Sequence, residues 1–234
     1  MMRAAILPQL GKNSAIGPDV LTIWGRRDSF NVQKVMWLIG ELAIKHRRIP
    51  TGGEFGGRDT PEFLAMNPHG RIPTIAVGDN IVWESHAILR YLAGHTRLAP
   101  FWTDDAYQRS LSDRWMDWSQ TVLEQDLMIG VFWGMVRVPE AQRNWNAINE
   151  KLTRCTAHFE LLNRVLENRD FLLGEAISLA DISIGATLYR YFTLDIERPV
   201  IPNVEAWYSR LKDRPAYREH VMVSYENLRG RPDG

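Results

Sequence analysis

The hydrophobic pattern of this chain changes near residue 104, and this change is the strongest constraint on its fold. Upstream, β-rich runs alternate with helical ones: a strand pattern over 21–24 precedes a helical pattern from about Phe30 to Leu42. Downstream, only helical spacing occurs, with apolar residues at steps of three and four between Trp145 and Leu166. The pattern therefore predicts an α/β domain followed by an all-helical domain.

The boundary between these domains is placed at residues 97–103, which contain Pro100. A short apolar patch, Ala4 to Leu7, is interrupted by Pro8 before it reaches the length of a signal-peptide core. The predicted units are an N-terminal extension (1–19), the α/β domain (20–96), a linker (97–103) and the helical domain (104–234).

Charge and cysteine content exclude several classes of function. The chain has 28 basic and 28 acidic residues, so it has no net charge with which to hold nucleic acid or an anionic membrane non-specifically. Its single cysteine, Cys155, cannot form an internal disulfide, a Cys-x-x-Cys pair or a cysteine-based zinc site. We therefore expect a cytoplasmic protein with no bound metal, no nucleic-acid partner and no membrane partner.

The strongest local motif is a proline-bounded loop, 67–74, followed by an acid-hydroxyl pair, Glu84-Ser85, that opens an apolar helix. An Ile-Pro bond at a strand edge leaves backbone groups available to an extended peptide, because proline cannot complete a sheet ladder. The carboxylate of Glu84 complements an ammonium group. The hydroxyl of Ser85 and the helix N–H groups complement a carboxylate. The motif therefore predicts a site for a small peptide.

This loop, followed by Glu-Ser-x-Ala-Ile-x-x-Tyr-Leu, resembles the glutathione site of cytosolic glutathione transferases. The resemblance implies a thioredoxin-like first domain, a helical second domain and glutathione as co-substrate. It implies that Pro73 is a cis-proline, that the Ile72 backbone pairs with the cysteinyl unit and that Glu84 and Ser85 bind the γ-glutamyl group. It places Arg71 near the glycyl end. On local sequence alone, Ile72-Pro73 can also be a loop end and Ser85 a helix N-cap.

The reactive group is sought in the loop before the first helix, because a free thiol of pKa about 8.5 is only a few per cent thiolate at pH 7. Ser29 stands six residues before Val35, which resembles the spacing of the catalytic serine in the theta, delta and phi classes. Ser29-Phe30-Asn31 is also similar to the Thr-Pro-Asn triplet of nu-class enzymes. The resemblance implies Ser29 as the main thiolate donor, assisted by Asn31. The alternative is an N-cap serine followed by a polar first-turn residue.

An electrophile pocket is expected where this loop faces the helical domain. The candidates are large apolar side chains: Trp118, Met128, Phe132, Trp133 and Tyr189. Phe132 and Trp133 are favoured over Trp118, because Gly130 and Gly134 beside them indicate a bend or loop, whereas helical spacing makes Trp118 a core residue.

Three polar residues are assigned no part in catalysis. Ser178 and Asp181 fit a variant capping box, so Asp181 is expected to serve folding. His86 is expected on a polar helix face.

Three functions remain open on the sequence. The first is conjugation of glutathione to a small hydrophobic electrophile by a homodimeric enzyme. The second keeps the fold but reduces peroxides or disulfides with the sulfur of glutathione. The third is a non-catalytic protein that binds glutathione or apolar ligands.

Overall fold

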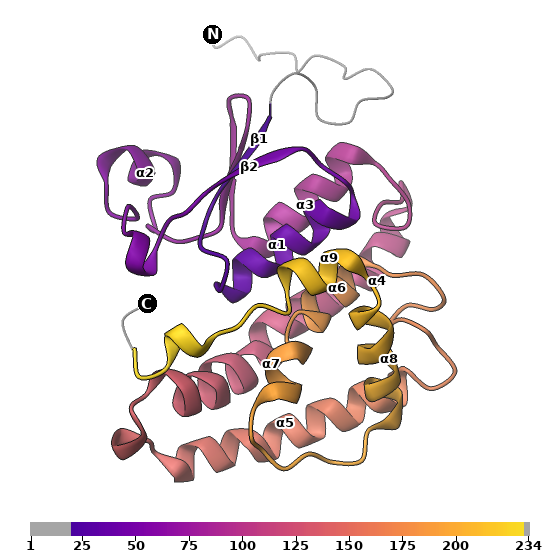
Figure 1. The fold of residues 1–234 in the computed structure, drawn as a ribbon. Coiled ribbons are helices and arrows are strands. Elements are labelled where there is room, and N and C mark those ends of the chain that lie inside the picture. The colour runs from indigo at the N-terminus through magenta and orange to yellow at the C-terminus, as the bar shows by residue number, and fades with distance from the viewer. Residues whose placement is uncertain (1–19, 232–234) are drawn as a thin grey trace, which may run out of the picture.

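The computed structural model describes residues 20–231, and the predicted extension, 1–19, lies outside them. An α/β half packs on a larger helical half (Figure 1). The elements of the first half are β1 (Leu21–Trp24), α1 (Phe30–Glu41), β2 (His46–Ile49), η1 (Gly53–Phe55), α2 (Pro61–Met66), β3 (Thr74–Val77), β4 (Asn80–Trp83) and α3 (Ser85–Thr96). The elements of the second half are α4 (Ala106–Trp118), η2 (Ser119–Leu123), η3 (Gln125–Arg137), η4 (Glu140–Gln142), α5 (Trp145–Val165), α6 (Leu179–Gly185), α7 (Leu188–Thr193), α8 (Pro202–Lys212), α9 (Pro215–His220) and η5 (Glu226–Leu228).

The four strands form one mixed sheet in the order β2-β1-β3-β4. β1 pairs in parallel with β2 and antiparallel with β3, and β3 pairs antiparallel with β4. The two central strands contribute Leu21, Ile23, Ile75 and Val77 to the core, and the edge strands are more exposed. The order βαβ, then α, then ββα is that of a thioredoxin-like domain, which confirms the fold that the resemblance implied for the first half.

Two backbone features follow the sequence closely. The peptide bond between Ile72 and Pro73 is cis, as predicted. Val77 pairs with Asn80, so a two-residue turn joins β3 to β4, and Gly78 adopts a φ of 57° at its first position. Glycine takes this φ without a steric penalty, which makes it suited to a tight hairpin.

Helix α1 joins the two halves of the molecule. It contacts α3 in its own half and α6 and α9 in the helical half. The fully buried Trp37 of α1 meets Tyr217 of α9 edge to face, with ring centroids 4.7 Å apart. Gly185 lies beneath this pair, where a Cβ would come within 3.1 Å of the Trp37 ring. The absence of a side chain at Gly185 thus allows α6 to approach α1 closely.

The segments Ser119–Leu123 and Gln125–Arg137 are π-helical, which corrects the bend or loop expected around Phe132 and Trp133. Gly130 and Gly134 serve helix packing instead. A Cβ at Gly130 would lie 2.6 Å from Lys151 Cγ, and one at Gly134 would lie 2.8 Å from Ile148 Cγ1, both on α5. The glycines let α5 and η3 approach closely. Wider π turns occur frequently at functional sites.

Asp181 has the predicted role in folding. Its buried carboxylate accepts hydrogen bonds from the backbone N–H and hydroxyl of Ser178 and from the N–H of Leu172, at 2.7 to 2.9 Å. Burial raises the pKa of Asp181 to about 6. His86, in contrast, does not lie on a polar face: it is 2% exposed, enclosed between the two halves. Within residues 20–231, no helix is both long and apolar enough to cross a membrane.

Candidate active site

A cavity of about 440 Å³ lies between the α/β half and the helical half. Its floor comes from the loop before α1, from the end of the 67–74 loop and from the N-cap of α3; its wall comes from η3 and α7. Eight of the residues expected at the site line it: Ser29, Asn31, Arg71, Ile72, Glu84, Met128, Phe132 and Trp133. Residues of the α/β half and residues of the helical half, which are far apart in sequence, therefore line the same cavity.

Glu84 stands at the N-cap of α3 in an unusual backbone conformation. Its φ is 69° and its ψ is 120°, a region that side-chain-bearing residues rarely adopt. Such strain costs of order 1–3 kcal/mol and concentrates at functional sites. The side chain is exposed to the cavity rather than used as a helix cap. Its carboxylate therefore remains available to a ligand.

Ser85 links the two predicted parts of the site. Its side chain is buried and its Oγ donates to Oδ1 of Asn31 over 3.3 Å, between residues 54 positions apart. Asn31 is exposed at the start of α1 and lines the cavity. The γ-glutamyl end of the predicted site and the predicted thiolate end are thus in hydrogen-bond contact.

Ser29 occupies the N-cap position of α1, with φ −73° and ψ 120°. Its carbonyl accepts the first helical hydrogen bond from Gln33 N–H at 2.9 Å, but its side chain does not cap the helix. The hydroxyl therefore lies half-buried at the cavity, free to donate to a ligand. Gly25 allows the loop to fold back here, because a Cβ at that position would lie 2.4 Å from Val32 Cγ2.

Asn67 organises the 67–74 loop, a role that sequence analysis missed. Its buried amide Nδ2 donates to the Arg71 carbonyl at 2.9 Å and to the Thr74 hydroxyl at 3.2 Å, and its Oδ1 accepts from the His69 N–H. These bonds fix the turn that presents Ile72. The proximity of an asparagine to a Pro-His-Gly turn was the available signal.

The apolar wall contains four side chains from η3: Met128, Ile129, Phe132 and Trp133. Trp118 does not line the cavity. Its ring packs edge to face on Trp115 and His158, with centroids 5.4 and 5.6 Å apart. Tyr189 packs against Tyr225 and also lies outside the lining. The helical spacing that marked Trp118 as a core residue agrees with this placement.

A buried ion pair beside Ser29 was also missed. Arg26 Nη1 lies 2.6 Å from Asp28 Oδ1, and Asn227 Nδ2 donates to Asp28 Oδ2 at 2.6 Å. Burial opposes ionisation of Asp28, but the bonds from Asn227 and Arg26 prevail and lower its pKa. The C-terminal segment thus reaches back across the molecule to the loop that carries Ser29 (Figure 1).

A second buried network joins the two halves beneath the cavity. Lys34 Nζ lies 2.7 Å from Glu124 Oε1 and 3.3 Å from His86 Nε2. Burial lowers the pKa of Lys34, although Glu124 opposes the shift. Burial and the nearby Lys34 charge lower the pKa of His86 to about 2, so its imidazole is neutral at neutral pH. Nothing in the pattern of α1 marked Lys34 as a fully buried residue.

Arg190 was missed as well. This arginine of α7 lines the cavity, although only 3% of its surface is exposed. Its Nη2 donates to the Asp28 carbonyl over 2.7 Å. Sequence analysis passed over it because the contact spans 162 positions.

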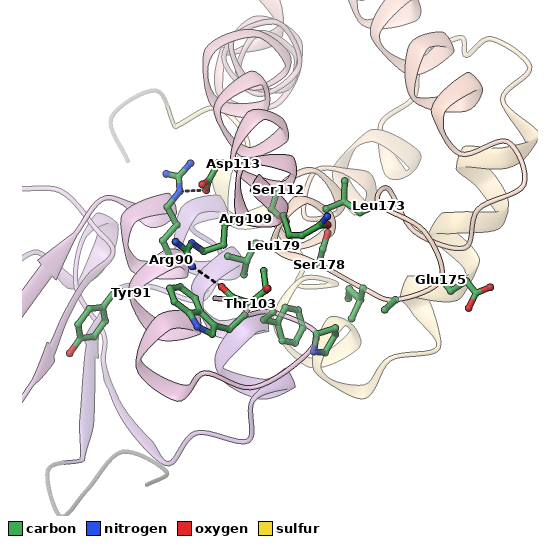
Figure 2. Close-up of a pocket in the computed structure, with 16 residues that line it drawn as sticks. Arg90, Tyr91, Thr103, Arg109, Ser112, Asp113, Leu173, Glu175, Ser178 and Leu179 are labelled. Atoms are coloured by element: carbon green, nitrogen blue, oxygen red, sulfur yellow. Dashed lines mark hydrogen bonds and ion pairs between the residues drawn. The ribbon is translucent and has the colours of Figure 1, made fainter. Parts of the chain in front are cut away.

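A larger hollow, of about 850 Å³, lies elsewhere, between α3, α4 and the segment 173–179 (Figure 2). Its charged groups are largely satisfied: Arg90 pairs with Asp113 at 2.6 Å, and Arg109 donates to the Thr103 carbonyl at 2.8 Å. None of the residues predicted for the glutathione site lines it. The smaller cavity is therefore the candidate active site.

Possible metal ligands do not gather in the part of the chain that the structure describes, and the single cysteine is buried. Within residues 20–231, no cluster of His, Cys, Asp and Glu side chains could hold a metal ion. Cys155 is buried on α5, and burial raises its pKa to about 12, which keeps it as an unreactive thiol.

Comparisons with known proteins agree with this geometry. Residues 19–94 match the family model for the glutathione S-transferase N-terminal domain, and residues 124–215 match that for the C-terminal domain. Glutathione S-transferase GstB of Escherichia coli K12 is 36% identical over 206 residues, which cover 87% of this chain and 99% of GstB. Disulfide-bond oxidoreductase YfcG of the same organism is 28% identical over 202 residues, covering 82% of this chain and 90% of YfcG.

Among solved structures, the theta class glutathione S-transferase of Xanthomonas axonopodis pv. citri with glutathione bound superposes with a TM-score of 0.83. It is 39% identical and the match covers 88% of this chain and 99% of that one. Taken with the cis-proline loop and the domain order, these matches show that the chain belongs to the glutathione S-transferase family.

Proposed function

We propose that this protein is a glutathione transferase that ionises the glutathione thiol and directs it at a hydrophobic electrophile. One observation carries the proposal: the Ser29 hydroxyl does not cap α1 and lies in the same cavity as the Glu84 carboxylate. The first group suits a sulfur anion and the second suits an ammonium group.

Each end of glutathione has a complementary partner in this arrangement. Glu84 binds the γ-glutamyl ammonium, and Ser85 with the N–H groups of α3 binds the adjoining carboxylate. The Ile72 backbone before the cis-proline pairs with the cysteinyl unit. Arg71, with Arg58 beside it in the lining, meets the glycyl carboxylate.

The charge of the cavity supports an anionic ligand. Five arginines and three carboxylates line it, an excess of two positive charges. Glutathione carries two carboxylates and one ammonium, and ionisation of its thiol adds a second net negative charge. The thiolate form therefore matches the cavity better than the thiol form does.

The electrophile binds against the wall formed by Met128, Phe132 and Trp133. Attack then joins the glutathione sulfur to the electrophilic carbon, and a leaving group departs or the electrophile accepts the electron pair. The apolar wall excludes water and holds the reacting carbon near the sulfur. In keeping with the family, we also propose a homodimer in the cytoplasm, for which light scattering should give twice the mass of the chain.

The deciding measurement is an ultraviolet titration of the thiolate of bound glutathione. We expect its apparent pKa to lie below the value of about 8.5 for a free thiol. Ser29→Ala should return the pKa toward that value and lower kcat about 100-fold, with a much smaller effect on glutathione affinity. Asn31→Ala should have a smaller effect of the same sign. Equal loss of kcat and affinity in Ser29→Ala would mean that the serine serves only the structure of the loop.

A disulfide reductase is the second candidate, favoured by the Ser29-Phe30-Asn31 triplet and the match to YfcG. Both reactions need the same thiolate, so the titration does not separate them. The ratio of kcat/KM for a chloronitroaromatic to kcat/KM for a small disulfide does. If glutathione binds but titrates as it does free in solution, both enzymatic functions are wrong and a binding role remains.

A further inference from the structure

Arg190 crosses from the helical half to the loop that carries Ser29. It belongs to α7, and its Nη2 donates to the carbonyl of Asp28 at 2.7 Å. Asp28 immediately precedes Ser29 in the chain. The guanidinium therefore holds the backbone from which the predicted thiolate donor projects.

Aromatic rings bracket the same guanidinium. Its Cζ lies 5.3 Å from the ring centroid of Phe30, the residue after Ser29, and 4.7 Å from that of Phe132 on the apolar wall. Both distances are typical of cation–π contacts. Arg190 thus lies where the glutathione floor meets the electrophile wall.

The charge of Arg190 has no carboxylate partner among residues 20–231, whose ion pairs do not include it. The Asp28 carboxylate favours the charged form of Arg190 but forms no ion pair with it, because it uses Oδ1 for Arg26 and Oδ2 for Asn227. The other buried cation near Phe30 differs in this respect, because Lys34 is paired with Glu124 at 2.7 Å. Burial lowers the pKa of Arg190 to about 9, which leaves it protonated at neutral pH.

A buried cation without a salt bridge is costly, and an anion placed nearby recovers part of that cost. The cavity that Arg190 lines opens onto Ser29, where the sulfur anion is expected. On the basis of the proposed function, we infer that Arg190 is a positioning residue that holds the Ser29 loop and supplies the positive charge that stabilises the glutathione thiolate. The thiol proton passes to water and its electron pair stays on sulfur, so Arg190 itself exchanges no proton.

The test separates the charge of Arg190 from its hydrogen bond. Arg190→Gln keeps an N–H donor for the Asp28 carbonyl but removes the charge, and Arg190→Lys keeps both a donor and the charge. Arg198→Gln is the matched control, because Arg198 also stacks on aromatic rings, of Tyr191 and Phe192, and donates to backbone carbonyls, but lies outside the cavity lining.

The thiolate of bound glutathione is titrated by ultraviolet absorbance in each variant and in the unaltered protein. We expect Arg190→Gln to raise the apparent pKa by about one unit, a roughly tenfold loss of thiolate at lower pH. Arg190→Lys should raise it by less than half as much, and Arg198→Gln should leave it unchanged. If Arg190→Gln does not fold, Arg190→Met takes its place, with the same expected shift.

The outcomes distinguish this inference from the proposed function. If the unaltered protein binds glutathione whose thiol titrates as it does free in solution, the proposed function is wrong. If that thiol is shifted and the neutral variant at position 190 leaves the shift intact, only the inference about Arg190 is wrong. A shift equal in Arg190→Lys and Arg190→Gln would assign Arg190 a geometric role alone and would overturn the electrostatic one.

Discussion

The two sides of the cavity are built in different ways. The floor, which contains Ile72 and Glu84, depends on backbone features that lie close together in sequence: a cis bond before Pro73 and an N-cap with a positive φ. The wall, which contains Phe132 and Arg190, depends on contacts between segments that are far apart. The floor can therefore be recognised from a short motif, whereas the wall exists only after the helical half has packed.

This difference predicts that substitutions can separate the binding of glutathione from the binding of the electrophile. Substitutions on the floor should act on glutathione, and substitutions on the wall should act on the electrophile. Groups that span the boundary should affect the stability of the whole.

The largest effect is expected at Lys34, which connects floor and wall through Glu124. Lys34→Met should lower the free energy of unfolding by about 3–5 kcal/mol, because it leaves a buried carboxylate without its cation. Urea unfolding measures the loss. Lys34→Met combined with Glu124→Leu should recover much of it, since both buried charges are then gone. A loss below about 1 kcal/mol in the single variant would show that the two sides are not joined here.

Glu84→Ala should specifically weaken glutathione binding. The loss of a charged hydrogen bond to the ammonium is worth about 1.5–3 kcal/mol, a rise in Kd of roughly 10- to 150-fold. Calorimetry measures the Kd, and KM for the electrophile should change little. Glu62→Ala is the matched control, because Glu62 is an exposed glutamate in the first turn of α2. Equal effects of the two substitutions would contradict a specific role for Glu84.

Two tryptophans allow the wall itself to be tested. Trp133 lines the cavity and is 39% exposed, whereas Trp118 packs on Trp115 and His158 away from it. Trp133→Ala should raise KM for an aromatic electrophile about fivefold, equivalent to about 1 kcal/mol of lost contact. Trp118→Ala should lower the thermal midpoint and leave KM unchanged. The reverse result would restore Trp118 to the electrophile pocket.

The smallest effect is expected from the pH dependence of Asp28. Its pKa is lowered in the folded protein, so its stabilising contribution is present above its unfolded pKa and is lost as pH falls through the folded one. The stability difference between the unaltered protein and Asp28→Asn should therefore shrink as pH is lowered from 6 to about 3. Urea unfolding at several pH values measures it. If the difference in unfolding free energy does not depend on pH, the bonds from Asn227 and Arg26 stabilise the neutral side chain as much as the charged one.

Most of the fold and part of the candidate site could be predicted from the sequence. Strand β1 begins and ends where the alternation predicted, and the loop around Pro73 has the predicted geometry, because each depends on local backbone preferences. Ser29, Asn31 and Glu84 line one cavity, as the motif required, although their catalytic and binding roles remain predictions.

The remainder could not be predicted for physical reasons. The glycines at 130 and 134 suggested a bend or loop, whereas the segments 119–123 and 125–137 are π-helical and the glycines admit side chains of α5. Lys34, His86 and Arg190 are polar side chains buried by partners 52 to 162 positions away, and no local pattern contains those partners. Burial of a charge is a property of the packed molecule rather than of its sequence neighbours.

The hydrogen bond from Asn227 to Asp28 has a consequence for biosynthesis. A ribosome makes the loop that carries Ser29 first, yet the two groups that bond to its Asp28, Arg190 and Asn227, are synthesised 162 and 199 positions later. Nascent chains shorter than this should possess a thioredoxin-like sheet without a finished catalytic centre. We therefore expect the Ser29 loop to reach its final geometry only after Asn227 has left the exit tunnel.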